Sequence, residues 1–211
     1  MDVSAIRKDY RLQSLDESQA AADPFGQFKT WFEEAVSAKV QEVNAMVLST
    51  VSKDGRPSGR VVLLKDFNNN GFSFFTNYKS PKGADLAQNP FASLTFFWPE
   101  LERQIRIEGV ATKLTDEESK KYFDSRPWES KVGAWASNQS EIILNRTELE
   151  NKFQNFSTKF KNTDVPKPEA WGGYRLKPDY FEFWQGRSGR LHDRLSYLIE
   201  NESWKIARLS P

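Results

Sequence analysis

The chain has 211 residues with 30 Lys+Arg against 29 Asp+Glu, a formal net charge of +1, so no global field attracts nucleic acid or an anionic membrane. It has no cysteine and a single histidine, which excludes disulfides, thiolate metal sites and histidine-cluster metal sites. Apolar stretches are short and interrupted by charges, and the first residues lack the basic and apolar regions of a signal peptide. We therefore expect a cytoplasmic protein without a membrane-spanning segment.

The first predicted element is a polar arm, followed by a helix and a series of strands. Residues 1–22 lack hydrophobic periodicity and predict a flexible N-terminal arm. Asp23-Pro24 suits an N-cap and first turn, and apolar residues from Phe25 to Val36 recur on one helical face. Alternating and β-rich runs then predict antiparallel strands over residues 45–51, 58–65, 72–76, 91–98 and 103–114.

The second half inserts helices before the strands resume. Thr115 with Glu118 forms a capping box that predicts a helix to about Asp124. Further helical patterns cover residues 128–136 and 141–161, and strands return over residues 173–184, 194–200 and 203–209. Short strands without βαβ alternation predict a mainly β (α+β) fold, an antiparallel barrel with peripheral helices. We find no internal repeat or linker, so residues 23–211 should form a single domain.

The histidine lies in Arg190-Leu191-His192-Asp193-Arg194. If this segment is extended, Arg190, His192 and Arg194 project to one side. Two guanidiniums on one face favour a bound phosphate or carboxylate between them. Taken alone, the same pattern is also typical of a solvated basic strand end.

Other polar groups suggest an anion site with a heterocycle beside it. Arg60 and Lys65 stand at the two ends of an apolar strand, and Lys79-Ser80-Pro81-Lys82 precedes a helix predicted to start near Gly83. A helix N-terminus with nearby lysines suits a phosphate. Gln104 and Gln139-Ser140 carry neutral groups of the kind that read the edge of a ring. Each feature alone is more often structural.

In combination and in order, these segments resemble the pyridoxine/pyridoxamine 5′-phosphate oxidase family. The signature is Phe181-Glu182-Phe183-Trp184-Gln185-Gly186 followed by Arg190-Leu191-His192-Asp193-Arg194. The other matching segments, in chain order, are Arg60–Lys65, Phe75–Asn77, Leu101–Gln104, Tyr122–Pro127, Gly133–Ser137 and Trp171–Arg175. The resemblance runs from about Arg7 to Pro211 and implies an FMN-binding split β-barrel, working as a homodimer with FMN at the interface.

The resemblance also implies roles for individual residues. Those expected to bind FMN are Arg60, Val61, Val62, Leu63, Leu64, Lys65, Phe75, Thr76, Lys82, Gln104, Gln139, Ser140, Trp184 and Arg194. Those expected to bind substrate are Arg7, Lys8, Asp9, Tyr10, Lys65, Tyr122, Arg126, Ser130, Arg190, Leu191 and His192, the first four in an arm that folds over the substrate. No metal is implied.

Arg190 and His192 are the implied catalytic residues. A guanidinium remains protonated, so Arg190 should orient the substrate electrostatically and not act as a base. His192 could accept a proton or only hydrogen-bond the substrate. The implied reaction is FMN-dependent oxidation of pyridoxine or pyridoxamine 5′-phosphate by O2, giving pyridoxal 5′-phosphate and hydrogen peroxide in vitamin B6 metabolism.

One position departs from the family pattern. The family usually has Arg-Lys where this chain has Pro81-Lys82, so one phosphate-binding cation is missing unless Lys79 replaces it. A lost charge-assisted hydrogen bond would weaken FMN binding by about 1.5–3 kcal/mol.

Three other functions fit parts of the sequence. A split-barrel flavin reductase or carrier would not need the Arg190/His192 pair, and a non-catalytic FMN- or pyridoxal-phosphate-binding module would also use the cations. A nucleic-acid-binding barrel would use aromatic and basic residues, but the net charge of +1 disfavours it.

Overall fold

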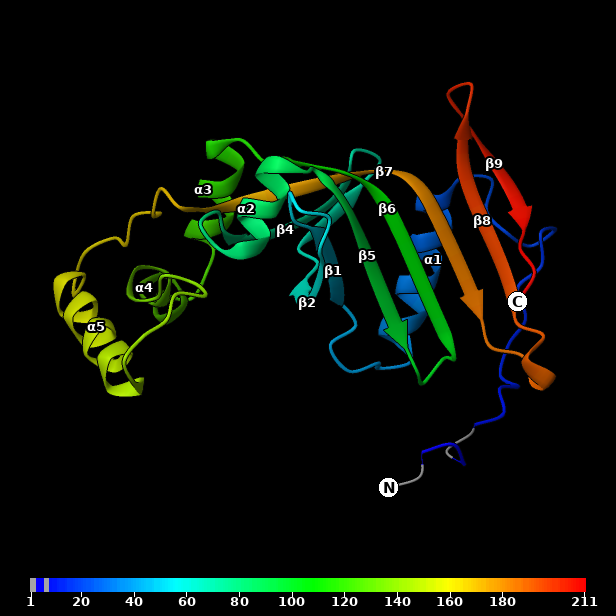
Figure 1. The fold of residues 1–211 in the computed structure, drawn as a ribbon, viewed down its shortest axis with the longest axis horizontal. Helices are drawn as coiled ribbons and strands as arrows, with labels where there is room; N and C mark the ends of the chain where they lie inside the picture. Colours follow the sequence, from blue (N-terminus) through cyan, green and yellow to red (C-terminus); the bar gives the residue numbers. More distant parts are fainter. Residues whose placement is uncertain (1–2, 6–7) are drawn as a thin grey trace.

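The computed structural model describes residues 3–5 and 8–211 and shows an antiparallel sheet curled into a half-barrel (Figure 1). Its nine strands contain a central path in the order β2-β1-β5-β6-β7-β4-β3, with β8 and β9 added beside β7. The strands are β1 (Ala45–Val51), β2 (Pro57–Leu63), β3 (Asp66–Asn68), β4 (Gly71–Asn77), β5 (Phe91–Trp98), β6 (Arg103–Lys113), β7 (Trp171–Gln185), β8 (Asp193–Glu200) and β9 (Ser203–Arg208). The predicted barrel is confirmed.

The described residues also form five α-helices: in Figure 1, α1 lies against the sheet, and α3, α4 and α5 lie beyond one end of it. They are α1 (Pro24–Ser37), α2 (Pro81–Gln88), α3 (Asp116–Asp124), α4 (Trp128–Ala136) and α5 (Arg146–Lys159). The predicted N-cap of α1 and capping box of α3 are both present. No helix in the described ranges is long and apolar enough to cross a membrane.

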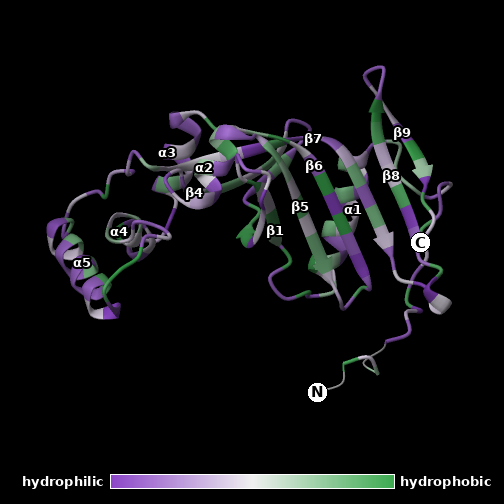
Figure 2. Cartoon of the chain, viewed as in Figure 1, coloured by the Kyte–Doolittle hydropathy of each residue, from purple (hydrophilic) through white to green (hydrophobic). Residues whose placement is uncertain are grey.

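The main core lies between α1 and the inner face of the sheet. Phe28 and Trp31 of α1 are almost fully buried and make edge contacts with Phe72, Phe96 and Phe183 of the strands. Burial alternates along β6, and the matching stripes of hydropathy are visible in Figure 2. The inner residues therefore form the core, while the alternate residues are left on the outer face.

A second apolar cluster joins α3, α4 and α5 to the start of β7. It contains the buried side chains of Phe123, Val132, Phe160 and Trp171. In Figure 1 these helices extend from one end of the sheet, away from β8 and β9.

Two predicted elements differ from the structure. The helix predicted from residue 141 begins at Arg146, because Asn145 caps it by accepting a hydrogen bond from the Glu148 N–H. The apolar run before it is exposed: Ile142 is fully solvent-accessible. The strand predicted over residues 58–65 ends at Leu63, and the short β3 follows.

The N-terminal segment is held by Glu102. This carboxylate is buried and accepts the backbone N–H groups of Arg11 and Leu12 at 2.8 and 3.1 Å, while Lys8 Nζ lies 3.5 Å from it. Further along, Leu15 is buried in the main core. The expected flexible arm is thus anchored over residues 8–15. The anchorage uses backbone N–H groups, which leave no periodic signal in the sequence. Arg7 lies outside the described residues.

Replacing Glu102 should release this segment. Hydrogen bonds to a charged group contribute about 1.5–3 kcal/mol each, so Glu102→Asn should speed amide hydrogen exchange in residues 8–15 about tenfold or more. Asparagine suits the positive φ of 55° at this position. Glu100→Asn, in the same turn but exposed, is the control. Unchanged exchange in Glu102→Asn would mean that other contacts hold the arm.

Candidate functional site

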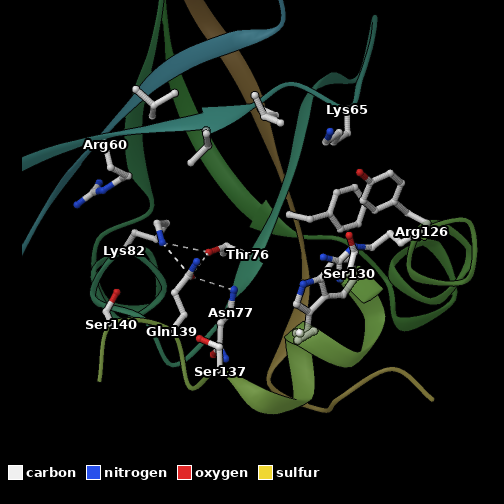
Figure 3. A pocket seen from close by; sticks show the side chains of 18 of the residues that line it. Arg60, Lys65, Thr76, Asn77, Lys82, Arg126, Ser130, Ser137, Gln139 and Ser140 are labelled. Carbon is white, nitrogen blue, oxygen red and sulfur yellow. Dashed lines mark hydrogen bonds between the residues drawn. The ribbon is translucent and has the colours of Figure 1, made fainter. Parts of the chain in front are cut away.

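A cavity of about 880 Å³ lies between β2, β4, α2 and the α3–α4 region (Figure 3). It brings together thirteen of the predicted binding residues, namely Arg60, Val61, Val62, Leu63, Lys65, Phe75, Thr76, Lys82, Tyr122, Arg126, Ser130, Gln139 and Ser140. Leu64, expected beside FMN, is instead buried in the main core. It lies just after the end of β2 and does not line the cavity.

Lys82 forms the cationic centre of one end. Its buried Nζ donates to Thr76 Oγ1 at 3.2 Å and Gln139 Oε1 at 3.0 Å (Figure 3). It also donates to Ser80 Oγ at 3.3 Å. Among the described residues no carboxylate forms an ion pair with it. Burial lowers the pKa of Lys82, and the nearby charge of Arg60 lowers it further. A buried cation surrounded by neutral oxygens is the arrangement that an anionic ligand would complete.

Arg60 adds a second cation at this end. Its Nη1 donates to Leu48 O at 3.2 Å and Thr50 Oγ1 at 2.7 Å, and its Nη2 donates to Ser58 Oγ at 2.7 Å. Burial lowers the pKa of Arg60 as well. These contacts fix the plane of the guanidinium beside the cavity.

Arg126 and Lys65 supply positive charge at the opposite side (Figure 3). The Arg126 guanidinium lies over the Trp171 ring at 4.9 Å and the Phe123 ring at 5.5 Å. Its Nη1 atom is buried without a hydrogen-bond partner, and burial lowers its pKa. Arg126 and Lys65 both line the cavity, so their positive charge faces any ligand bound there. The cavity therefore fits two anionic groups, one at each end.

Several cavity residues were not predicted. Asn77, Gly133, Ser137 and Trp171 line the cavity, although all lie within segments that carry the family resemblance. Lys79 is exposed and does not line it, so the predicted replacement of the missing cation by Lys79 finds no support. Pro81 occupies the first position of α2 and is exposed.

The remaining predicted FMN residues form a row on the outer face of the sheet. Gln104 of β6 pairs with Trp184 of β7, which pairs with Arg194 of β8. Arg194 Nε donates to the buried Glu182 at 2.9 Å. None of the three lines the cavity.

The predicted geometry of the signature segment is wrong. Ser188–Arg190 forms a 3-10 turn, and Gly189 and Arg190 have positive φ values of 64° and 62°. The strand begins only at Asp193, so the expected alternation of Arg190, His192 and Arg194 on one extended face does not apply. Gly189, which readily adopts positive φ, was the sequence signal for this turn. Arg190 itself is exposed.

His192 packs between Trp184 and the N-terminal segment. Its ring centroid lies 4.6 Å from that of Trp184 and 5.9 Å from that of Tyr10. His192 Nδ1 accepts the Arg187 backbone N–H at 3.1 Å, so the proton of the neutral ring is on Nε2.

The other arm residues lie near this cluster. Lys8 approaches the Tyr10 ring at 5.7 Å, and Asp9 pairs with Arg11. Leu191 is exposed. None of Lys8, Asp9, Tyr10, Arg190, Leu191 and His192 lines the cavity.

Comparisons with known proteins agree with this architecture. The pyridoxamine 5′-phosphate oxidase family profile matches residues 32–160, and one described as the pyridoxine 5′-phosphate oxidase C-terminal dimerisation region matches residues 171–211. A pyridoxine/pyridoxamine 5′-phosphate oxidase from Nostoc punctiforme is 54% identical over 99% of this chain and 98% of its own. One from Cupriavidus pinatubonensis is 54% identical over 98% and 97%. The PhzG structure from Burkholderia lata, in complex with tetrahydrophenazine-1-carboxylic acid, is 32% identical, covers 95% of this chain and 99% of its own, and has a TM-score of 0.89.

The curled antiparallel sheet and its peripheral helices define a split-barrel protein. The chain belongs to the pyridoxine/pyridoxamine 5′-phosphate oxidase family. The match to the dimerisation region, which contains β7, β8 and β9, indicates a homodimer.

Removing the buried charge of Lys82 should stabilise the protein without ligand. The folded-state pKa is below the usual 10.5, so folding disfavours the charged amine and stability should rise with pH between these two values. We expect Lys82→Met to raise the free energy of unfolding at pH 7 on the order of 1 kcal/mol and to flatten that rise. Urea unfolding across pH measures both effects, with the exposed Lys79→Met as control. A large loss of stability in Lys82→Met would contradict this account.

Proposed function

We propose that the protein is an FMN-dependent oxidase that converts pyridoxine or pyridoxamine 5′-phosphate with O2 to pyridoxal 5′-phosphate and hydrogen peroxide. The observation that carries the proposal is the pair of cationic ends in one cavity, Arg60 with Lys82 and Arg126 with Lys65. Both the cofactor and the substrate carry a phosphate, so two anion sites are needed. The names of the relatives that are 54% identical support the same activity.

The Lys82 end is the proposed site for the FMN phosphate. Arg60 and Lys82 would neutralise its charge, and Thr76, Gln139 and Ser140 would hydrogen-bond it or the adjoining polar groups. The cavity-facing residues from Val61 to Lys65, with Phe75, would lie along the flat flavin. FMN, when bound, accepts two electrons from the substrate carbon and passes them to O2.

The Arg126 end is the proposed site for the substrate phosphate. The Arg126 guanidinium, which lines the cavity, would donate to it, with Lys65, Tyr122 and Ser130 as further partners. Tyr122 stacks on Phe75 with ring centroids 4.0 Å apart, which fixes the orientation of its hydroxyl group.

A second subunit would complete the site. Strand β7 has 15 residues, on the order of 50 Å at about 3.3 Å per residue, with Trp171 in the cavity at one end and Trp184 near the other. Gln104, Trp184 and Arg194 do not line the cavity of their own subunit. Val61 lines the cavity but is also 65% exposed, beside the exposed Val47 on the outer face. These two adjacent exposed apolar side chains favour a partner subunit at the cavity mouth. The second subunit would bring its own copies of Gln104, Trp184 and Arg194 to the flavin.

The same arrangement would bring Arg190 and His192 to the substrate. Arg190 retains its charge and would orient the reacting carbon. His192 has Nδ1 occupied by the Arg187 N–H, so we assign it as a hydrogen-bond donor through Nε2 and not as the base. Lys8, Asp9 and Tyr10, with Arg7 before them, would cover the substrate.

A phenazine-type substrate is the second candidate, because the PhzG structure holds such a ligand. Identity to PhzG is 32%, against 54% to relatives named as pyridoxine/pyridoxamine 5′-phosphate oxidases.

The reaction can be tested directly on the flavin-loaded protein. Pyridoxamine 5′-phosphate should bleach the flavin absorbance without oxygen, and in air O2 should be consumed as hydrogen peroxide forms. Arg126→Met should weaken substrate binding about 10–100-fold, with little change for unphosphorylated pyridoxamine. Lys121→Met, at an exposed position of α3, is the control. Failure of both phosphorylated substrates to reduce the flavin would refute the proposed activity.

The two signature residues should differ in their effects. Arg190→Met should lower kcat/KM about 100-fold or more, and Arg190→Lys should recover part of the loss. His192→Asn should cost about tenfold, mostly through KM, and leave the pH profile of anaerobic flavin reduction unchanged. If His192→Asn instead abolishes reduction and alters that profile, His192 is the base.

Mixed dimers should reveal whether the site is shared. Arg60→Ala changes a residue that lines the cavity, and Arg190→Met changes a residue that does not, so the two variants remove different parts of the proposed shared site. Each homodimer should therefore have little activity. Random reassembly should restore about a quarter of wild-type activity, since roughly half of the dimers are mixed and each has one intact site. Purely additive residual activities would show that each subunit builds its site alone.

A further inference from the structure

Thr50 and Asp85 are linked to Arg60 by a chain of two hydrogen bonds, which we call the relay. Thr50 of β1 is fully buried, and its Oγ1 lies 2.7 Å from Arg60 Nη1 and 2.7 Å from Asp85 Oδ2. A guanidinium only donates and an ionised carboxylate only accepts. The order of donors is therefore fixed: Arg60 donates to Thr50, and the Thr50 hydroxyl donates to Asp85.

The relay determines which way the Thr50 hydroxyl points. Its single proton is taken by Asp85, so only its lone pairs are available to Arg60. Without a strong acceptor at position 85, the hydroxyl could rotate and lose this fixed orientation. Among the described residues, Asp85 forms no ion pair with Arg60, although its charge acts to raise the pKa of Arg60. Thr50 hydrogen-bonds both groups.

Helix α2 carries both parts of the anion site. Lys82, in the first turn, faces the cavity, and Asp85 lies about one turn later. Burial, and then repulsion by the like charge of Arg60, lower the pKa of Lys82. The hydrogen bonds from Arg60 to Leu48, Thr50 and Ser58 hold its guanidinium in place against this repulsion.

We propose that Thr50 and Asp85 are positioning residues that hold the Arg60 guanidinium for the phosphate of the bound flavin. The inference rests on the proposed FMN site and adds to it two residues that do not line the cavity. Neither residue would touch the ligand. Their effect on the phosphate passes through Arg60.

Positioning and simple electrostatics lead to opposite results at Asp85. If Asp85 acts only through its charge, Asp85→Asn removes a negative charge near an anion and should strengthen FMN binding. If Asp85 positions Arg60 through Thr50, the same variant should weaken FMN binding. The amide keeps the size of the side chain, so packing is preserved in either case.

The test compares FMN with riboflavin, which lacks the phosphate, by flavin fluorescence titration of the flavin-free full-length protein. Asp85→Asn and Thr50→Val should each weaken FMN binding about three- to tenfold and leave riboflavin binding unchanged. Thr50→Ser, which keeps the hydroxyl, should retain FMN affinity. Asp54→Asn makes the same charge change in the exposed β1–β2 turn and should have no effect.

A double-mutant cycle gives the second measurement. In an Arg60→Ala background, Asp85→Asn should have no further effect on FMN binding, because the group it positions is gone. Tighter or unchanged FMN binding in Asp85→Asn overturns the inference, as does an equal loss for riboflavin. Wild-type protein that binds riboflavin and FMN equally would instead overturn the proposed phosphate site. If Thr50→Val fails to fold, Asp85→Asn alone decides.

Discussion

Strand β7 is the constraint on which the rest of the molecule depends. It pairs with β4 near its start, β6 along its length and β8 near its end, so it links the helical end of the sheet to the C-terminal strands. A bulge opposite Gly109 bends it, and a Cβ there would lie 2.1 Å from Lys177 O. Trp171, at the start of this strand, lines the cavity, and Trp184, near its end, does not, so the predicted site residues fall into two groups along β7.

The cavity combines rigid support with unsatisfied charge. Arg126 is held over Trp171, and Lys82 is held by Thr76, Ser80 and Gln139, so the cations are in place before a ligand arrives. Pre-positioned donors lose little freedom on binding, which favours affinity and orientation. Holding these cations in the folded chain is costly. Burial lowers the pKa values of Lys82 and Arg126, and one N–H group of Arg126 has no hydrogen-bond partner.

Much of the fold followed from local signals, and much of the site from the family resemblance. The Thr115–Glu118 capping box and helix Trp128–Ala136 depend on neighbouring residues, so they were predictable. Strand β3, with three residues, has too little pattern to detect. The inward turn of Leu64, the relay through Thr50 and the Glu102 anchor depend on contacts between distant segments, which periodicity does not encode.

The unpaired cations also bear on the lifetime of the chain. A ligand that binds only the folded state stabilises it in proportion to the logarithm of its concentration relative to Kd. A chain whose buried Lys82 lacks an anion opens more often and exposes more backbone to proteases. A ligand that fills the cavity would therefore also make the folded chain more resistant to proteolysis.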